Sequence, residues 1–292
     1  MTDEQPHILE LDDAVHGRRR IACLKQEGQG PTVVWLQGFM SDMASTKASA
    51  LADWAGRTGR AMLRLDYSGH GRSSGRIEDG SIGLWLADAR AAVLELTDGP
   101  VVLVGSSMGG WISLLLARAF SSVVDTGSRQ ENATKHRSRT VSRVNRSGNR
   151  SRDRQLEPRL AGVVLIAPAW DMTERLMWAQ LDDGIRRTIE QDGVWMRPSA
   201  HGPGGYPITR ALIEDGRAHL LAGRGFDPGC PVRIIQGMRD PDVPFAGSLE
   251  LVDLIARDDV RLTLVKDGEH RLSRDGDIAL MLATIAELVD PH

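Results

Sequence analysis

The sequence predicts an α/β fold with a mostly parallel central sheet, helices on both faces and a helical cap. Three observations support this prediction. Short apolar runs of Val, Leu and Ile alternate with longer segments of helical spacing. Several of these runs end in glycine-rich turns, which is typical of parallel strands buried on both faces. The chain has 292 residues, a length that suits one such domain with an inserted cap.

The stretch from Val101 to Gly110 reads VVLVGSSMGG, and the rest of the fold is organised around it. Its first four residues predict a buried strand, and Trp111 to Ala119 predicts a helix. The turn between them matches the pattern G-x-S-x-G only as Gly105, Ser107 and Gly109. A serine at the centre of such a turn is strained, and larger flanking residues would collide with the strand or helix. Ser107 is therefore the candidate nucleophile. The alternative is a serine in an ordinary strand-to-helix turn.

The elements before this stretch follow the same alternation. Apolar patterns predict two antiparallel edge strands at 7–12 and 19–25, and buried strands at 32–37 and 61–66. Helical spacing predicts helices at about 44–57 and at 81–97. Ser81 is the expected N-cap of the second helix, and Gly99-Pro100 ends it.

The loop at 67–75 contains three glycines, but their spacing matches neither the P-loop nor the dinucleotide-binding fingerprint. We expect a structural turn in which Asp66 accepts hydrogen bonds from backbone N–H groups. His70 lies in this loop, before the candidate nucleophile in the chain. Folds with a serine nucleophile on such a turn place the triad in the order serine, acid, histidine, so His70 is not expected to be the base.

The C-terminal part supplies the acid and the histidine that this order requires. Strands are predicted at 160–167, 231–236 and 261–266, and a helix at 246–256. Asp240 follows the second of these strands, shortly before Val243-Pro244, and Asp242 is the fallback acid. His270 follows the last predicted strand, where the base of a triad belongs. Ser107, Asp240 and His270 each lie at the carboxyl end of a predicted strand.

These residue types in this order predict acyl transfer. His270 takes the proton of the Ser107 hydroxyl as it attacks a carbonyl, and Asp240 holds the imidazole tautomer. The developing oxyanion needs two backbone N–H groups, one after the nucleophile and one from the loop after strand 32–37. We expect these to be the N–H groups of Met108 and Phe39. The alternative for the second is that Gly38-Phe39 is only a turn that ends the strand. No metal site and no cofactor is expected.

The net charge, the cysteines and the apolar runs of the sequence indicate which partners and which cellular compartment to expect. The net charge is −3, so nucleic acid or an anionic membrane is not implied as a partner. Cys23 and Cys230 are far apart in sequence, which suits a reducing compartment. The N-terminus has no secretory pattern, and no apolar run approaches the roughly 20 residues of a membrane span. We expect a cytoplasmic protein without a membrane span. The sequence leaves its oligomeric state open.

The composition changes abruptly between Ser121 and Pro158, where arginine, serine and asparagine dominate. With so few apolar residues, this segment is expected to be a disordered basic insertion at 121–158. The alternatives are a basic arm that binds RNA, acidic protein or a membrane surface, and an irregularity of the sequence itself.

The stretch at 169–229 contains Trp and Met side chains on short amphipathic pieces and predicts a helical cap over the core, which comprises 1–168 and 230–292. Trp170, Trp178 and Trp195 are the candidate substrate-binding residues, because aromatic side chains there would form an apolar wall for an acyl chain. The alternative is that they pack the cap against the core.

Several motifs together resemble one family. They are LDYSG at 65–69, DGP at 98–100, GSSMGGW at 105–111, GVWMRPS at 193–199, and GMRD at 237–240 with VP at 243–244. They resemble the motifs of the α/β-hydrolase superfamily. Within it, they resemble the branch of mitochondrial palmitoyl-protein thioesterases, which are also known as acyl-glucuronide esterases. The resemblance covers nearly the whole chain except the N-terminus and 121–158.

The resemblance implies an α/β-hydrolase fold in which Ser107, Asp240 and His270 take the triad positions. It also implies hydrolysis of S-acyl or O-acyl esters, with a small-molecule or protein-linked acyl group as substrate. The alternatives within the fold are a general carboxylesterase and a C–C bond hydrolase. A non-catalytic binding protein of the same fold is the alternative from another class.

Overall fold

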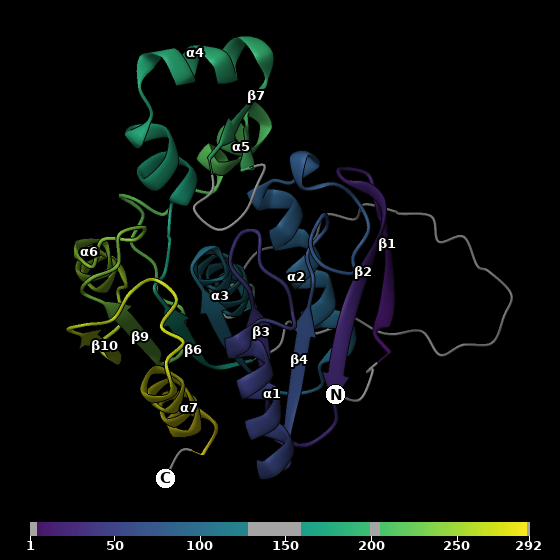
Figure 1. The fold of residues 1–292 in the computed structure, drawn as a ribbon. Coiled ribbons are helices and arrows are strands. Elements are labelled where there is room, and N and C mark those ends of the chain that lie inside the picture. The colour runs from purple at the N-terminus through teal and green to yellow at the C-terminus, as the bar shows by residue number, and fades with distance from the viewer. Residues whose placement is uncertain (1–4, 128–158, 199–204, 291–292) are drawn as a thin grey trace, which may run out of the picture.

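The computed structural model describes residues 5–127, 159–198 and 205–290, and a large central sheet runs through them (Figure 1). In this part of the chain the sheet has eight strands in the order β1-β2-β4-β3-β5-β6-β9-β10. Their bounds are β1 His7–Asp13, β2 Gly17–Gln26, β3 Gln29–Leu36, β4 Arg60–Leu65, β5 Val101–Ser106, β6 Leu160–Ile166, β9 Val232–Gly237 and β10 Val260–Val265. Strand β2 is antiparallel to both of its neighbours, and the remaining neighbouring pairs are parallel. The predicted mostly parallel sheet with an antiparallel edge is confirmed.

Helices cover both faces of this sheet (Figure 1). Their bounds are α1 Thr46–Thr58, α2 Ile82–Leu96, α3 Met108–Gly127, α6 Ala246–Leu254 and α7 Asp275–Val289. Helices α1 and α7 share one apolar cluster with the sheet, in which Leu51 and Ile285 are fully buried. Helices α2, α3 and α6 belong to the cluster on the other face. Helix α7 follows the last element predicted from the sequence and was not itself predicted.

The cap lies between β6 and β9 and is not built of helices alone. It contains a π-helical turn at Thr173–Met177, a 3₁₀ turn at Trp178–Gln180, α4 Asp183–Asp192, β7 Val194–Arg197, β8 Tyr206–Thr209 and α5 Arg210–Ala218. Strands β7 and β8 form an antiparallel pair. Gly193, with φ of +82°, ends α4 and turns the chain into β7, where exposed and half-buried residues alternate. The expectation of a helical cap therefore missed a two-stranded sheet.

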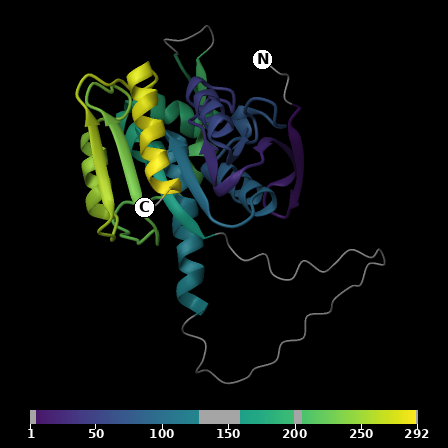
Figure 2. The same ribbon diagram turned by 90° about the horizontal axis from the view of Figure 1, so that it is seen from below.

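Helix α3 is longer than predicted. It continues through Ser121, where the composition changes, and ends at Gly127. Figure 2 shows its C-terminal half extending past the sheet. The polar composition after Ser121 therefore does not mark the end of the helix, since the first strong helix breaker is Gly127. The disordered insertion predicted at 121–158 is therefore wrong for 121–127, which belong to α3. Its remaining residues, 128–158, lie outside the described residues.

The central strand and α3 approach each other very closely at two glycines. A Cβ on Gly109 would lie 1.9 Å from the carbonyl oxygen of Leu36 in β3, and a Cβ on Gly105 would lie 2.2 Å from the carbonyl oxygen of Gly109. Both collisions are with backbone atoms, which cannot move without disturbing the sheet or helix. This explains why the turn around Ser107 requires glycine on both sides.

No helix in the described part of the chain has the length and apolar character that crossing a bilayer requires.

We expect Gly109→Ala to lower the free energy of unfolding by about 1 to 3 kcal/mol or more, because the methyl group forces α3 away from β3. Gly276→Ala in the first turn of α7 is the matched control, because nothing lies within 4 Å of a Cβ there. That change is expected to raise the stability by up to about 1 kcal/mol. Urea unfolding followed by tryptophan fluorescence measures both, and equal stabilities of the two variants would contradict the close approach.

Candidate active site

Ser107 lies in a strained turn between β5 and α3. Its φ is +55°, in the left-handed region that residues with a side chain rarely adopt. Backbone hydrogen bonds hold this conformation. The Ser107 N–H donates to the carbonyl of Ile166 at 2.9 Å, and the Ser107 carbonyl accepts from Gly110 at 2.9 Å and from Ala169 at 3.1 Å. The strain expected from the sequence motif is thus present and is supported from three neighbouring residues.

The structure brings Ser107, His270 and Asp240 together in one hydrogen-bonded line. His270 Nε2 lies 3.1 Å from Ser107 Oγ, and His270 Nδ1 lies 2.8 Å from Asp240 Oδ2. The Asp240 side chain is fully buried, whereas 24% of the His270 side chain is exposed. A buried carboxylate therefore faces one ring nitrogen, and the serine hydroxyl faces the other.

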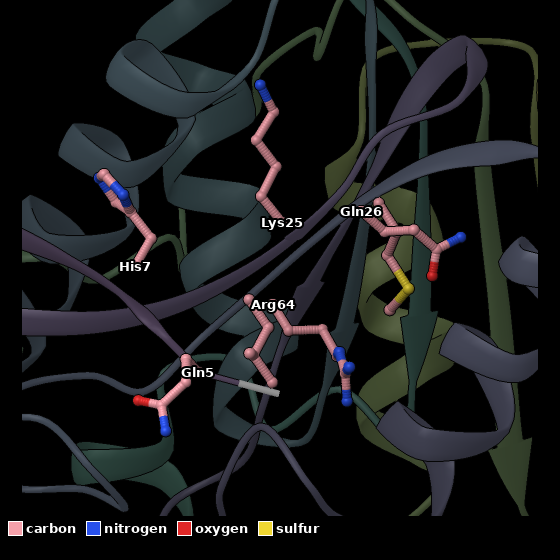
Figure 3. Close-up of a pocket in the computed structure, with 7 residues that line it drawn as sticks. Gln5, His7, Lys25, Gln26 and Arg64 are labelled. Atoms are coloured by element: carbon pink, nitrogen blue, oxygen red, sulfur yellow. The ribbon is translucent and has the colours of Figure 1, made fainter. Parts of the chain in front are cut away.

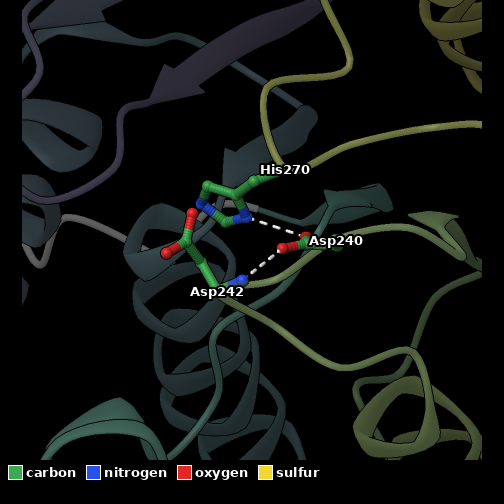
Figure 4. Close-up of side chains that lie close together, drawn as sticks. All are labelled: Asp240, Asp242 and His270. Atoms are coloured by element: carbon green, nitrogen blue, oxygen red, sulfur yellow. Dashed lines mark hydrogen bonds and ion pairs between the residues drawn. The ribbon is translucent and has the colours of Figure 1, made fainter. Parts of the chain in front are cut away.

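Asp240, and not the fallback Asp242, occupies the position behind the imidazole (Figure 4). Oδ1 of Asp240 accepts hydrogen bonds from the backbone N–H groups of Asp242 and Val243, at 2.9 and 2.8 Å. Oδ2 accepts from Gln236 Nε2 at 3.2 Å in addition to facing His270. Both oxygens of the Asp240 carboxylate are thus fixed. Asp242 donates its backbone N–H to one of them, and its own side chain is exposed.

Asp240, Asp242 and His270 also have side-chain N and O atoms within 4.8 Å of one another, a spacing compatible with a metal ion. The ring of His270 nevertheless uses Nδ1 for Asp240 and Nε2 for Ser107. This arrangement fits proton transfer between the serine hydroxyl and the imidazole.

The loop that carries His270 is attached to the core on two sides. The Lys47 ammonium in α1 donates a hydrogen bond to the carbonyl of Arg271, the residue after the histidine. Burial lowers the pKa of Lys47 to about 8. From the other side, the Arg239 N–H donates to the carbonyl of Gly268 at 2.9 Å. These contacts fix the backbone on either side of the imidazole.

The loop after β3 lies directly beside the serine. A Cβ on Gly38 would lie 3.2 Å from Ser107 Cβ. The Ser41 N–H donates to the carbonyl of Gly38 at 3.2 Å, which closes a turn with Phe39 at its second position. Met108 is the first residue of α3, where a helix leaves N–H groups without an intrahelical acceptor. In the described part of the chain, no acceptor is bonded to the N–H of Phe39 or of Met108.

Asp66 connects this loop to the loop after β4. Its Oδ1 accepts from the Met43 N–H at 2.7 Å, and its Oδ2 accepts from the Arg72 N–H at 2.8 Å. Burial raises the pKa of Asp66, and the two backbone hydrogen bonds oppose that rise. The expected bond to the turn at 67–75 is confirmed, and the bond to Met43 was not predicted.

The three tryptophans expected to bind substrate have different surroundings. Trp170 is only 4% exposed, its indole N–H donates to the carbonyl of Gly247 at 2.9 Å, and the Arg175 guanidinium lies 4.0 Å from the ring centroid. Its edge and one face are therefore occupied by the protein. The expectation that Trp170 lines an open acyl-binding wall is corrected: it packs the cap against α6.

Trp178 and Trp195 are both half-buried. The Trp178 ring lies near the guanidinium groups of Arg186 and Arg217, at 5.6 and 5.0 Å from its centroid. Trp195 in β7 is paired with Ile208 and packs on the larger apolar cluster. Contact of these two residues with substrate stays a prediction.

Two aromatic neighbours of the loop after β3 were not predicted from the sequence. The Tyr206 ring in β8 meets the Phe39 ring edge to face, with centroids 5.9 Å apart. His70, set aside as a catalytic base, accepts a hydrogen bond at Nε2 from the Met40 N–H at 3.2 Å. The glycines around His70 indicated a tight turn, but no local pattern showed that this turn touches the loop after β3.

Two buried cysteines and one hollow of the described part lie apart from this site. Cys23 and Cys230 are buried, and burial raises the pKa of each thiol to about 12, which leaves both protonated at neutral pH. A hollow of about 230 Å³ lies on the first strands (Figure 3) and is lined by Gln5, His7, Leu24, Lys25, Gln26, Met62 and Arg64. None of these residues belongs to the loops that carry the serine, the acid or the histidine.

Comparisons with known proteins agree with this geometry. Residues 33–279 match the model of the alpha/beta hydrolase family. The mitochondrial palmitoyl-protein thioesterase ABHD10 of Pongo abelii is 31% identical over 271 residues, which cover 92% of this chain and 76% of that protein.

Two solved structures are similar over nearly their whole length. A putative hydrolase from Agrobacterium vitis S4 is 37% identical, with a TM-score of 0.81, covering 98% of this chain and 99% of the other. Mouse alpha/beta hydrolase domain-containing protein 10 is 28% identical, with a TM-score of 0.74, covering 97% and 98%. With its sheet order, its strained serine and these relatives, the chain belongs to the alpha/beta hydrolase family.

Proposed function

We propose that the protein is a serine hydrolase that cleaves acyl thioesters or carboxylic esters through an acyl-enzyme. The observation that carries the proposal is the 3.1 Å approach of His270 Nε2 to Ser107 Oγ, with Asp240 Oδ2 2.8 Å from the opposite ring nitrogen. This geometry supports a hydroxyl activated by a base whose tautomer a buried carboxylate fixes.

In the acylation step, Ser107 Oγ attacks the acyl carbonyl and His270 Nε2 accepts its proton. Asp240 stabilises the resulting imidazolium and keeps its own charge. The N–H groups of Phe39 and Met108 donate to the oxyanion, an effect worth about 3 to 4 kcal/mol per donor in comparable sites. The imidazolium then protonates the leaving thiolate or alkoxide as the bond from carbon to sulfur or oxygen breaks.

Deacylation repeats these steps with water as the nucleophile. His270 takes a proton from water, the hydroxide attacks the acyl-enzyme carbonyl, and Ser107 regains its proton as the leaving group. A partly exposed imidazole suits this step, since water must reach Nε2 without displacing the acyl group.

The substrate class is supported by the relatives. The curated relative from Pongo abelii is named a palmitoyl-protein thioesterase, and we extend acyl thioester hydrolysis to this chain. A general carboxylesterase and a C–C bond hydrolase are the alternatives within the fold. A non-catalytic binding protein is the alternative outside catalysis, and the aligned serine, histidine and aspartate argue against it. The relative is named mitochondrial, whereas the cytoplasmic location predicted for this chain stays a proposal.

The first test is covalent labelling. A fluorophosphonate probe is expected to label the wild-type protein and to leave Ser107→Ala unlabelled, with hydrolysis reduced at least about 10³-fold. The adjacent Ser106→Ala is the matched control and is expected to keep both labelling and turnover, because Ser106 ends β5 and takes no part in the triad. Labelling that persists in Ser107→Ala would reject the nucleophile.

The second test separates the two candidate acids. Asp240→Asn keeps the volume but removes the charge behind the imidazole, and we expect kcat to fall by about 10⁴-fold, as the same change does in a serine protease. Asp242→Asn is expected to keep most of the activity, because that side chain is exposed. Steady-state kinetics at neutral pH measures both variants, and the opposite ranking would contradict the assignment of Asp240.

The third test addresses the leaving group. A series of acyl chain lengths, each as a thioester and as a p-nitrophenyl ester, is expected to give kcat/KM values on sulfur that match or exceed those on oxygen. Hydrolysis of both the thioesters and the p-nitrophenyl esters depends on Ser107, because both form the same acyl-enzyme. Turnover of oxygen esters alone would favour the carboxylesterase, and turnover of neither thioesters nor oxygen esters would reject both ester activities.

A further inference from the structure

We propose that His70 is a positioning residue that holds the loop after β3 with the Phe39 N–H facing the oxyanion. The inference rests on the proposed function, because it assigns the Phe39 N–H a part in acyl transfer. It gives a role to a buried histidine that the triad does not use. The structural observation is a hydrogen bond from the Met40 N–H to His70 Nε2 at 3.2 Å.

The two neighbours of the ring define its protonation state. The Met40 N–H can only donate, so His70 Nε2 must offer a lone pair. His70 Nδ1 lies 3.3 Å from the carbonyl of Ser68, which can only accept, so Nδ1 carries the proton. Both bonds form together only in the neutral Nδ1–H tautomer. A protonated ring would present a second N–H to the Met40 N–H and lose the contact.

The surroundings of His70 favour this neutral form. The residue is 4% exposed and lies among three aromatic rings, with centroids 5.2 Å from Trp85, 5.8 Å from Tyr67 and 6.3 Å from Phe39. Burial lowers the pKa of His70, and its hydrogen bond to Ser68 opposes that change. The ring thus remains an uncharged acceptor at neutral pH.

Met40 needs this support because its backbone is strained. Its φ is +59°, although it carries a side chain, and that side chain is 50% exposed. Little packing of its own therefore holds Met40 in place. The Met40 N–H that His70 binds lies one Cα away from the peptide unit that carries the Phe39 N–H. Loss of this bond would therefore let the turn shift and move the Phe39 N–H relative to Ser107.

The other end of the loop has a separate attachment. The Met43 N–H donates to Asp66 at 2.7 Å, and the Met43 carbonyl accepts from Arg64 at 3.2 Å. Loss of His70 should therefore release the turn at Phe39 and Met40 while the loop stays attached at Met43. This predicts a local loss of oxyanion stabilisation in a folded protein.

The kinetic test compares His70→Leu with His70→Gln. The leucine variant keeps an apolar side chain but removes the acceptor, and we expect kcat to fall about 10- to 100-fold with KM little changed, as for a small misplacement of a catalytic group. The amide oxygen of His70→Gln can accept from the Met40 N–H, so this variant is expected to recover part of the loss. Inhibition by a trifluoromethyl ketone, which forms the oxyanion on Ser107, should weaken in parallel with kcat/KM.

Two control variants separate positioning from stability. Tyr67→Phe keeps the ring that packs edge to face on His70 and removes only its hydroxyl, and this variant is expected to leave kcat unchanged. Val93→Ala in α2 destabilises the same face of the sheet, away from the loop. A loss of kcat in Val93→Ala equal to that of His70→Leu, at equal melting temperature, would overturn the proposal. So would full activity in folded His70→Leu.

An NMR measurement that does not depend on enzyme turnover separates the role of His70 from the proposed function. The ¹⁵N chemical shifts of His70 are expected to report the neutral Nδ1–H tautomer, and the Met40 amide should exchange faster with solvent in His70→Leu. An Nε2–H tautomer in the wild type would contradict only the role proposed for His70 and would leave the proposed hydrolase function untouched. A wild-type protein that shows this tautomer but neither reacts with fluorophosphonate nor hydrolyses esters would contradict the proposed function instead.

Discussion

The left-handed backbone of Ser107 is the constraint on which the rest of the site depends. A serine at φ of +55° is costly and persists only where its neighbours over-determine it. Here Ile166 at the end of β6 accepts from its N–H and Ala169 after β6 donates to its carbonyl. Gly109 lets α3 approach β3 closely. The strain lifts the hydroxyl above the sheet, where His270 reaches it.

The strand order explains how distant residues meet around this serine. Strand β5 lies between β3 and β6, and β9 and β10 follow on the same side as β6. Because these strands are parallel, their carboxyl ends share one edge of the sheet, where ligands bind in open α/β folds. Phe39, Ser107, Asp240 and His270 come from the loops at that edge. Residues separated by up to 163 positions are thereby brought within hydrogen-bonding distance.

Patterns that depend on local burial were predictable, and contacts between loops were not. The apolar strands and the order of serine, acid and histidine follow from periodicity and from the nucleophile motif. The two strands of the cap were missed because they have only four residues each. The packing role of Trp170 could not be predicted, because its partner Gly247 lies 77 positions away. The bond of His70 to Met40 exists only because β4 lies next to β3, which no local pattern reveals.

The central claim is that Ser107 forms a tetrahedral adduct whose oxygen lies between two backbone N–H groups. A crystal structure of the protein after reaction with a fluorophosphonate tests it most directly. We expect phosphorus bonded to Ser107 Oγ and the phosphonyl oxygen within about 2.7 to 3.1 Å of the N–H nitrogens of Phe39 and Met108. An adduct on another side chain, or a phosphonyl oxygen turned away from both N–H groups, would contradict the account.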